Sequence, residues 1–282
     1  PRPGHADLVG GIKYDQRDLR NVLERASARE TAARVAVGGV ARRLLEEFGV
    51  TIFSAVTQIG PESTDIDVAA LDGSDAFDDS PLRCPDSEAE GRMVDFIKRC
   101  QKSGDTCGGV FTVVAKGLPV GLGSHTSWDR KLDGRVAAAM MSIQAMKGVA
   151  IGLGFDGAAL PGSQAHDEIF YDNDRRSFYR ETNRAGGLEG GITNGMPLVV
   201  HVAMKPISTL ARALRSVDVN TKEPFTAQKE RTDSCAVPAG GVVGEAMLAI
   251  VLAEAWLEKF GGDSLAEMRR NYESYQDYVR AV

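Results

Sequence analysis

Val242-Val243-Gly244-Glu245-Ala246-Met247-Leu248-Ala249-Ile250-Val251-Leu252-Ala253 is apolar at almost every position. It lies in a helix predicted over residues 240–260, which Gly261-Gly262 would end. A helix without a polar face has to be covered on both sides. A second predicted helix, 132–149, is nearly as apolar all round. Together they predict an α+β fold in which a helical layer is buried between sheets.

The remaining segments complete this prediction. Further helices are expected over about 27–48, 86–100 and 265–279, and strands over 50–59, 107–122 and 197–204. Because strands and helices do not alternate regularly, a doubly wound parallel sheet is disfavoured. Residues 71–85 are acidic, with Asp72, Asp75, Asp78 and Asp79, and predict a surface loop, while 152–180 predicts a mobile loop or hairpin. With no repeat or linker, 1–282 is predicted to be a single domain.

Composition excludes several classes of protein. The 282 residues carry a net charge of −6 without a run of Lys or Arg, so no nucleic-acid partner is expected. Glu245 and Glu254 interrupt the most apolar segment, so no membrane span is expected either. None of the four cysteines, Cys84, Cys100, Cys107 and Cys235, has CxxC spacing to another. This absence indicates reduced thiols in a cytoplasmic protein.

Arg25-Ala26-Ser27-Ala28-Arg29-Glu30-Thr31 opens one of the predicted helices. Ser27 and Glu30 have the spacing of a capping box. Cations oppose the helix dipole at this end, so Arg25 and Arg29 favour an anionic ligand, which the free N–H groups would also attract. A solvated, well-capped helix start is the plainer alternative.

Two other stretches could approach a ligand. Residues 182–195 contain Gly186, Gly187, Gly190, Gly191 and Gly195, which suit close backbone contact with a flat or phosphorylated ligand, or else form a flexible hairpin. Lys205-Pro206-Ile207-Ser208-Thr209 follows a predicted strand, and its Lys and hydroxyls could hold a phosphate.

Individual polar residues give weaker signals. Gln144, inside the apolar helix predicted over 132–149, needs partners from the backbone or from a ligand. Asp233, close to Arg231, either stabilises a turn or transfers a proton. His201 alternates with strand residues and is predicted to be structural. No histidine pair has metal-ligand spacing and no GxSxG motif occurs, which disfavours zinc and nucleophilic hydrolases.

Nine motifs, in order along the chain, resemble the chorismate synthase family. They are RPGHAD (2–7), RASARETAARVAVG (25–38), DTCGG (105–109), GLPVGLGS (117–124), SIQAMKGV (142–149), AHDE (165–168), TNRAGGLEGGITNG (182–195), MKPIST (204–209) and RTDSCAVPAGGVVGEAMLAIVLAE (231–254).

The resemblance implies a β-α-β sandwich, a homotetramer and the last step of the shikimate pathway. The family converts 5-enolpyruvylshikimate 3-phosphate to chorismate and phosphate by a 1,4-anti elimination. The reaction needs reduced FMN, which is thought to lend an electron as phosphate leaves, and some members use NADPH to reduce the flavin.

The resemblance also assigns residues. Cofactor-binding positions are Arg25, Ala26, Ser27, Gln144, Ala145, Gly190, Lys205, Pro206, Ile207, Ser208, Thr209 and Arg231. Catalytic positions are His5, which would protonate the reduced flavin or lie by its N1 edge, and Asp233, which would work with flavin N5 in removing the C6 proton. Arg2, Arg29 and Arg231 suit the carboxylates and phosphate of the substrate.

The family opens with a GESHG-type segment carrying another histidine, which is not found in 1–282. We therefore expect residues before Pro1 in the natural protein and an incomplete active site in this chain. One alternative is an inactive body of the same fold that binds FMN or another anion. A more distant one is a phosphosugar enzyme without flavin.

Overall fold

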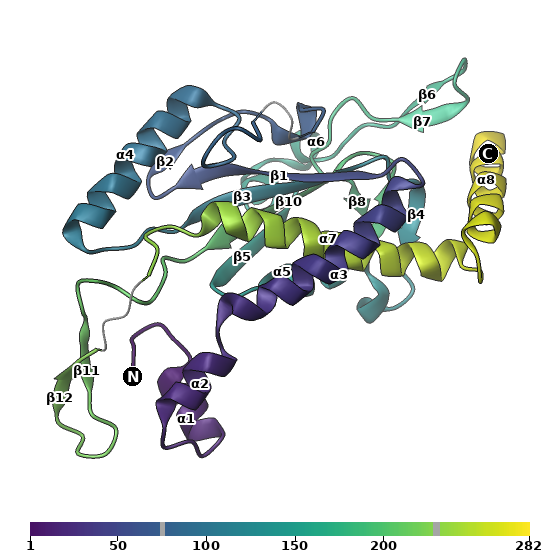
Figure 1. Ribbon diagram of the computed structural model, residues 1–282. Coiled ribbons are helices and arrows are strands. Elements are labelled where there is room, and N and C mark those ends of the chain that lie inside the picture. The colour runs from purple at the N-terminus through teal and green to yellow at the C-terminus, as the bar shows by residue number, and fades with distance from the viewer. Residues whose placement is uncertain (74–76, 228–231) are drawn as a thin grey trace.

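The computed structural model describes residues 1–73, 77–227 and 232–282. Helix α7 (Val237–Phe260) runs along one face of a five-stranded sheet, with α3 (Thr31–Glu46) crossing over it (Figure 1). By length and composition α7 could cross a membrane, but 72% of its most apolar window is buried inside the fold. Its apolar surface is therefore used as core.

The main sheet is antiparallel throughout, in the order β2-β1-β3-β10-β5. Its strands are β1 (Thr51–Ile59), β2 (Glu62–Ser63), β3 (Gly109–Lys116), β5 (Met146–Ile151) and β10 (Leu198–Met204). A second antiparallel sheet has the order β4-β9-β8, from β4 (Val120–Gly123), β8 (Leu188–Glu189) and β9 (Ile192–Asn194).

The helical layer lies between these sheets. Helix α7 contacts β1 and β3 of the main sheet and β4 of the smaller one, and α5 (Leu132–Met141) contacts β5 and β9. The predicted α+β fold with antiparallel sheets is thus confirmed. The predicted strand region 107–122 is split between the two sheets as β3 and β4.

Close backbone packing joins α3 to α7. A Cβ added to Gly38 would lie 2.4 Å from Cβ and 2.6 Å from Cα of Ala246, so only glycine allows this approach.

The charged Glu245 of α7 is buried, where it accepts a hydrogen bond from Ser54 Oγ at 2.7 Å and forms ion pairs with Arg83 and Arg42 at 3.0 and 3.2 Å. A buried carboxylate with this many partners is compensated.

The prediction of a single helix over 132–149 is wrong for the second half of that segment. Helix α5 ends at Met141, Ala145 adopts a left-handed φ of 69°, and 146–151 becomes strand β5 beside β10. An apolar run has no period that separates a buried helix from a buried strand, so the sequence pattern alone could not make this distinction.

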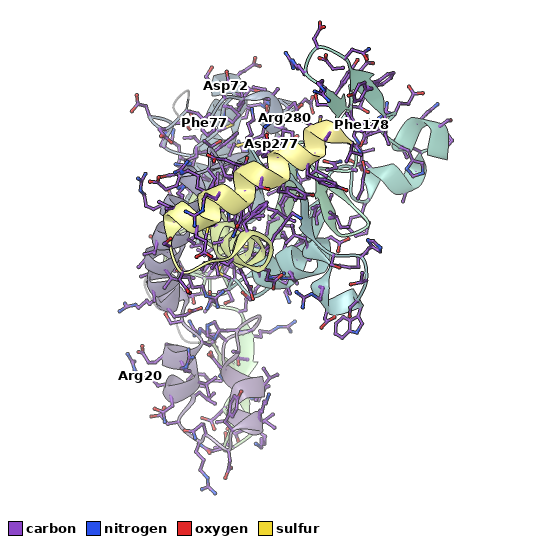
Figure 2. All side chains as sticks on the ribbon, turned by 90° about the vertical axis from the view of Figure 1, so that its right-hand side faces the viewer. Arg20, Asp72, Phe77, Phe178, Asp277 and Arg280 are labelled. Carbon is purple, nitrogen blue, oxygen red and sulfur yellow. The ribbon has the colours of Figure 1, made fainter. Side chains whose placement is uncertain are left out.

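The acidic segment 71–85 is not wholly a surface loop. Phe77 is buried with Phe53, Ala55, Val68 and Val114 in a second core cluster. Asp75 lies outside the described residues. In Figure 2, Phe77 and Asp72 lie in the main body, while Arg20 lies on a small helical unit at the other end of the molecule.

That small unit was not predicted. It pairs α1 (Asp7–Lys13) with α2 (Leu19–Arg25), near the hairpin of β11 (Arg215–Val217) and β12 (Pro224–Thr226) (Figure 1). The other elements are α4 (Ser87–Ser103), α6 (Gly162–Ala165), α8 (Leu265–Ala281), β6 (Phe170–Asp172) and β7 (Ser177–Tyr179). The last two strands form a hairpin within 152–180, one of the two forms expected there.

Candidate active site

The start of α3 contacts the turn after α5. Ser27 caps a short 3-10 turn, Ala28–Glu30, by accepting from the N–H of Arg29 at 3.3 Å. The predicted capping box does not form, because the Glu30 carboxylate binds Arg34 at 2.7 Å and Gln144 Nε2 at 2.5 Å. Hydrogen bonds from Arg34 and then Gln144 lower the pKa of Glu30.

Gln144 lies in this turn and not in a helix. Its Oε1 atom is buried and has no hydrogen-bond partner among the described residues. The next residue, Ala145, accepts a hydrogen bond from the N–H of Lys205 at 3.0 Å. The turn therefore joins residues 27–30 to the end of β10. Within this turn, Gln144 Oε1 is a buried acceptor without a hydrogen-bond donor among the described residues.

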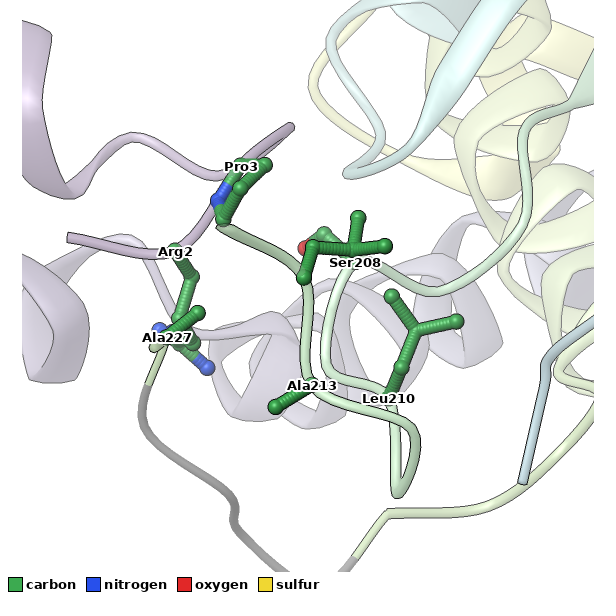
Figure 3. Close-up of a pocket in the computed structure, with 7 residues that line it drawn as sticks. Arg2, Pro3, Ser208, Leu210, Ala213 and Ala227 are labelled. Atoms are coloured by element: carbon green, nitrogen blue, oxygen red, sulfur yellow. The ribbon is translucent and has the colours of Figure 1, made fainter. Parts of the chain in front are cut away.

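The end of β10 packs against the first residues of the chain. Lys205 Nζ donates to the carbonyl of Gly4, and Arg2 Nη1 donates to Thr209 Oγ1 at 2.7 Å. Burial, and then the charge of Lys147, lower the pKa of Lys205. Figure 3 shows a small pocket beside these contacts, lined by Arg2 and Pro3 from the first residues and by Ser208, Leu210 and Ala213 from the segment after β10.

A buried cluster of charges fixes His5. Arg2 Nε donates to Asp7 Oδ2 at 2.9 Å, and His5 Nδ1 lies 2.5 Å from Asp7 Oδ1. Burial acts to raise the pKa of Asp7, but the hydrogen bonds from Arg2 outweigh it and the pKa is lowered. Arg2 thus holds the segment around His5 in place. The contact that we predict between Arg2 and the substrate stays a prediction.

Sequence reasoning missed Asp7. The residue was part of the RPGHAD motif, but nothing in its spacing distinguished it from a helix-opening acid. Its burial, with 5% of the side chain exposed, is the feature that marks it.

The residues around Asp233 join the same region through 105–108. Thr106 Oγ1 donates to the carbonyl of Ile207 at 2.6 Å, and the N–H of Cys107 donates to the carbonyl of Ser234 at 2.8 Å. Asp233 itself is exposed. Arg231 lies outside the described residues, so its two predicted roles have no structural account.

Arg25 and Arg29 are exposed at this end of the molecule. Arg25 and Ala26 line a hollow between α1 and α2, whose other walls are Ala6, Gly10, Tyr14, Gln16, Asn21 and Val22. The exposed Arg25 gives this hollow a positive charge that suits an anionic ligand.

Gly190 is not brought to this region. The carbonyl of its neighbour Gly191 accepts a hydrogen bond from the N–H of Leu132, which is the first residue of α5. Gln144 follows the last residue of the same helix, Met141. A ten-residue helix is about 15 Å long, so the two predicted cofactor contacts are separated by at least that element.

Other glycines of 182–195 have a structural reason. A Cβ on Gly186 would lie 2.2 Å from the backbone N of Gly152, and one on Gly187 would lie 2.5 Å from the carbonyl of Pro197. Asp167 holds this stretch by accepting from Thr182 Oγ1 at 2.5 Å and from the N–H groups of Arg184 and Ala185. The close approach at these two glycines is to the chain's own backbone.

Comparisons with known proteins agree on one family. The family model for chorismate synthase matches residues 1–257. The chorismate synthase of Geobacter sulfurreducens is 59% identical over 99% of this chain and 73% of its own length, and that of Aquifex aeolicus is 56% identical over 100% and 73%. A crystal structure of a chorismate synthase matches with a TM-score of 0.85 and 49% identity, over 98% of this chain and 77% of the other.

Proposed function

The chain belongs to the chorismate synthase family, a lyase of the shikimate pathway, and from this premise we propose the finer chemistry of its site. The proposal is that residues 1–7, 25–30, 144–145, 204–209 and 232–235 form one side of a site for reduced FMN and 5-enolpyruvylshikimate 3-phosphate. The reaction is the 1,4-anti elimination of phosphate, which classes the enzyme as a carbon–oxygen lyase acting on a phosphate.

The observation that carries the proposal is the unpartnered Oε1 of Gln144. A buried acceptor without a donor costs about 1–3 kcal/mol, so its retention needs a reason. A flavin ring edge carries an N–H group that would satisfy it. The left-handed Ala145 and the positive Lys205 beside it are consistent with a planar, anionic group at this turn.

Bound reduced FMN would supply the transient electron that eases the departure of phosphate. The chain's own part is to bind charge and to hold protons. Arg29 is exposed and available for the carboxylates and phosphate of the substrate, which Arg binds bidentately, and Arg25, also exposed, is assigned to the flavin. The predicted cluster at 25–31 thereby keeps its anion-binding interpretation in preference to that of a merely solvated helix start.

His5 and Asp233 have the two proton roles. His5 presents Nδ1 to Asp7 and Arg2, and no described residue bonds to its Nε2, which suits that atom for holding a proton. Asp233 is exposed at the turn before α7, and we assign to it the removal of the C6 proton.

Anaerobic mixing of the protein with photoreduced FMN and 5-enolpyruvylshikimate 3-phosphate tests the proposal. The expected result is a transient change in flavin absorbance together with chorismate, from 1–282 or from a version extended before Pro1. Chorismate only from the extended version would support the expectation that the active site of 1–282 is incomplete, whereas FMN binding without chorismate from either version would support the alternative of an inactive FMN-binding body. No chorismate from the extended version would refute the proposed chemistry, and absence of FMN binding would favour a phosphosugar enzyme without flavin.

The remaining proposals concern the assembly and the flavin source. We propose a cytoplasmic homotetramer, which light scattering of the purified protein would test. Oxidation of NADPH by the FMN-loaded protein would show whether it reduces its own flavin.

A further inference from the structure

Cys107 and Cys235 lie side by side although they are far apart in sequence. A parallel β-bridge pairs them, and the N–H of Cys107 donates to the carbonyl of Ser234 at 2.8 Å. Neighbouring strands are about 4.8 Å apart. Disulfides span Cα separations of about 4.4–6.8 Å, so the separation expected of bridge partners lies within the range that a disulfide can span.

The two thiols interact and differ in environment. Cys107 is buried, with 4% exposed, whereas Cys235 is partly exposed. Cys107 Sγ donates to the carbonyl of Ser234 at 3.5 Å, next to the Cys235 thiol. Interaction with the Cys107 thiol lowers the pKa of Cys235 to about 7, and the same interaction, with burial, raises the pKa of Cys107. The thiolate is the reactive form of cysteine, so Cys235 is the nucleophile of the pair.

We propose that Cys235 and Cys107 form a peroxide-sensitive pair, in which Cys235 is oxidised first and Cys107 then closes a disulfide. The Cys235 thiolate attacks hydrogen peroxide, giving a sulfenic acid and hydroxide. Cys107 then attacks that sulfur as its proton passes to the departing hydroxyl group, which forms the S–S bond and releases water. The bond would tie 232–235, which carries Asp233, to 105–108.

The other cysteines define the alternatives. Cys100 also lies close enough to interact with Cys107 and is a competing partner. Cys84 donates to the carbonyl of Asp86, and burial raises its pKa, so it serves as an unreactive reference. The inference depends on the pairing of the two cysteines and on the lowered pKa of Cys235, and it stands whether or not the proposed flavin chemistry is correct.

Peptide mapping of the reduced, folded 282-residue protein after exposure to hydrogen peroxide at pH 7 tests the proposal. Cleavage after Arg83, Arg99, Lys102 and Arg231 puts the four cysteines on separate tryptic peptides. The expected product joins the peptides of Cys107 and Cys235 and is removed by dithiothreitol. The matched control, Cys84→Ser, should form it at the same rate.

A second variant, Cys107→Ala, separates the oxidation of Cys235 from the closure of the disulfide. In Cys107→Ala the disulfide cannot form, so a sulfenic acid should be trapped at Cys235 by dimedone. The midpoint pH for alkylation of Cys235 should rise from about 7 towards about 8.5 because the thiol donor is gone. A Cys100–Cys107 disulfide, or no disulfide in folded wild-type protein, would overturn the proposal, as would an unchanged alkylation midpoint.

Discussion

Gln144 Nε2 donates to Glu30 Oε1 over 2.5 Å, a bond that joins the turn after α5 to the start of α3. The donor end of the amide is fixed by this carboxylate, which also binds Arg34. The opposite oxygen is thereby held in one orientation and lacks a donor among the described residues. The Gln144–Glu30 hydrogen bond thus orients Gln144 Oε1, the acceptor that we assign to the flavin.

Gln144→Leu should weaken FMN binding about tenfold, because a lost hydrogen bond of about 1–1.5 kcal/mol corresponds to that factor. Flavin fluorescence titration measures the Kd. Gln164→Leu, at an exposed position in α6, is the matched control and should bind FMN as the wild type does. Equal affinity of all three proteins would remove Gln144 from the site.

Asp7→Asn should release the first residues of the chain and reduce kcat. Removing one partner from a buried ion pair costs about 3–5 kcal/mol, and Arg2 would keep its charge without the carboxylate. Hydrogen exchange of residues 2–7 should rise, and chorismate formation should fall in whichever version, 1–282 or one extended before Pro1, forms chorismate. Asp18→Asn should change neither, since Asn also caps the start of α2.

Gly38→Ala should lower the free energy of unfolding by about 1–3 kcal/mol, because its methyl group would overlap Ala246 in α7. Gly39→Ala, one residue along α3, meets no described atom within 4 Å. It should instead stabilise the helix by about 0.5–1 kcal/mol. Urea unfolding of the two variants measures the contrast, and two equal effects would contradict the packing of α3 on α7.

His201 should make the fold less stable at mildly acidic pH. Thr112 Oγ1 lies 2.8 Å from His201 Nδ1, which confirms the predicted structural role, and burial lowers the pKa of His201 below 6.5. The unfolded chain therefore binds a proton that the folded chain does not, and stability falls as pH drops below about 6.5. In His201→Asn the dependence of the unfolding free energy on pH in this window should be shallower.

Residues 152–180 should become protected from hydrogen exchange when substrate and FMN bind. The segment contains the β6–β7 hairpin, whose Phe178 and Tyr171 are exposed, so a ligand-dependent closure would have apolar surface to bury. Unchanged exchange between the ligand-free and ligand-bound protein would show that this segment is not a lid.

The motifs could be read from the sequence because their chemistry is local. Ser27 caps a helical turn as its type predicts, although the turn is a 3-10 turn and Glu30 has other partners. Nothing in the sequence pattern distinguished the strand 146–151 from a continuation of α5, since both would be buried and apolar. The roles of Asp7 and of the Cys107–Cys235 pair were invisible because each depends on a neighbour that only folding supplies.

The sequence by itself determined the apolar helix at 242–253, the antiparallel α+β class and the family, because periodicity and motif order are properties of the chain. Only the tertiary structure decided that Gln144 meets Glu30, that Arg2 is occupied by Asp7 and Thr209, and that Gly190 lies beyond the far end of α5. These outcomes depend on contacts between residues distant in sequence, whose geometry is set by packing around α7 and not by any local pattern.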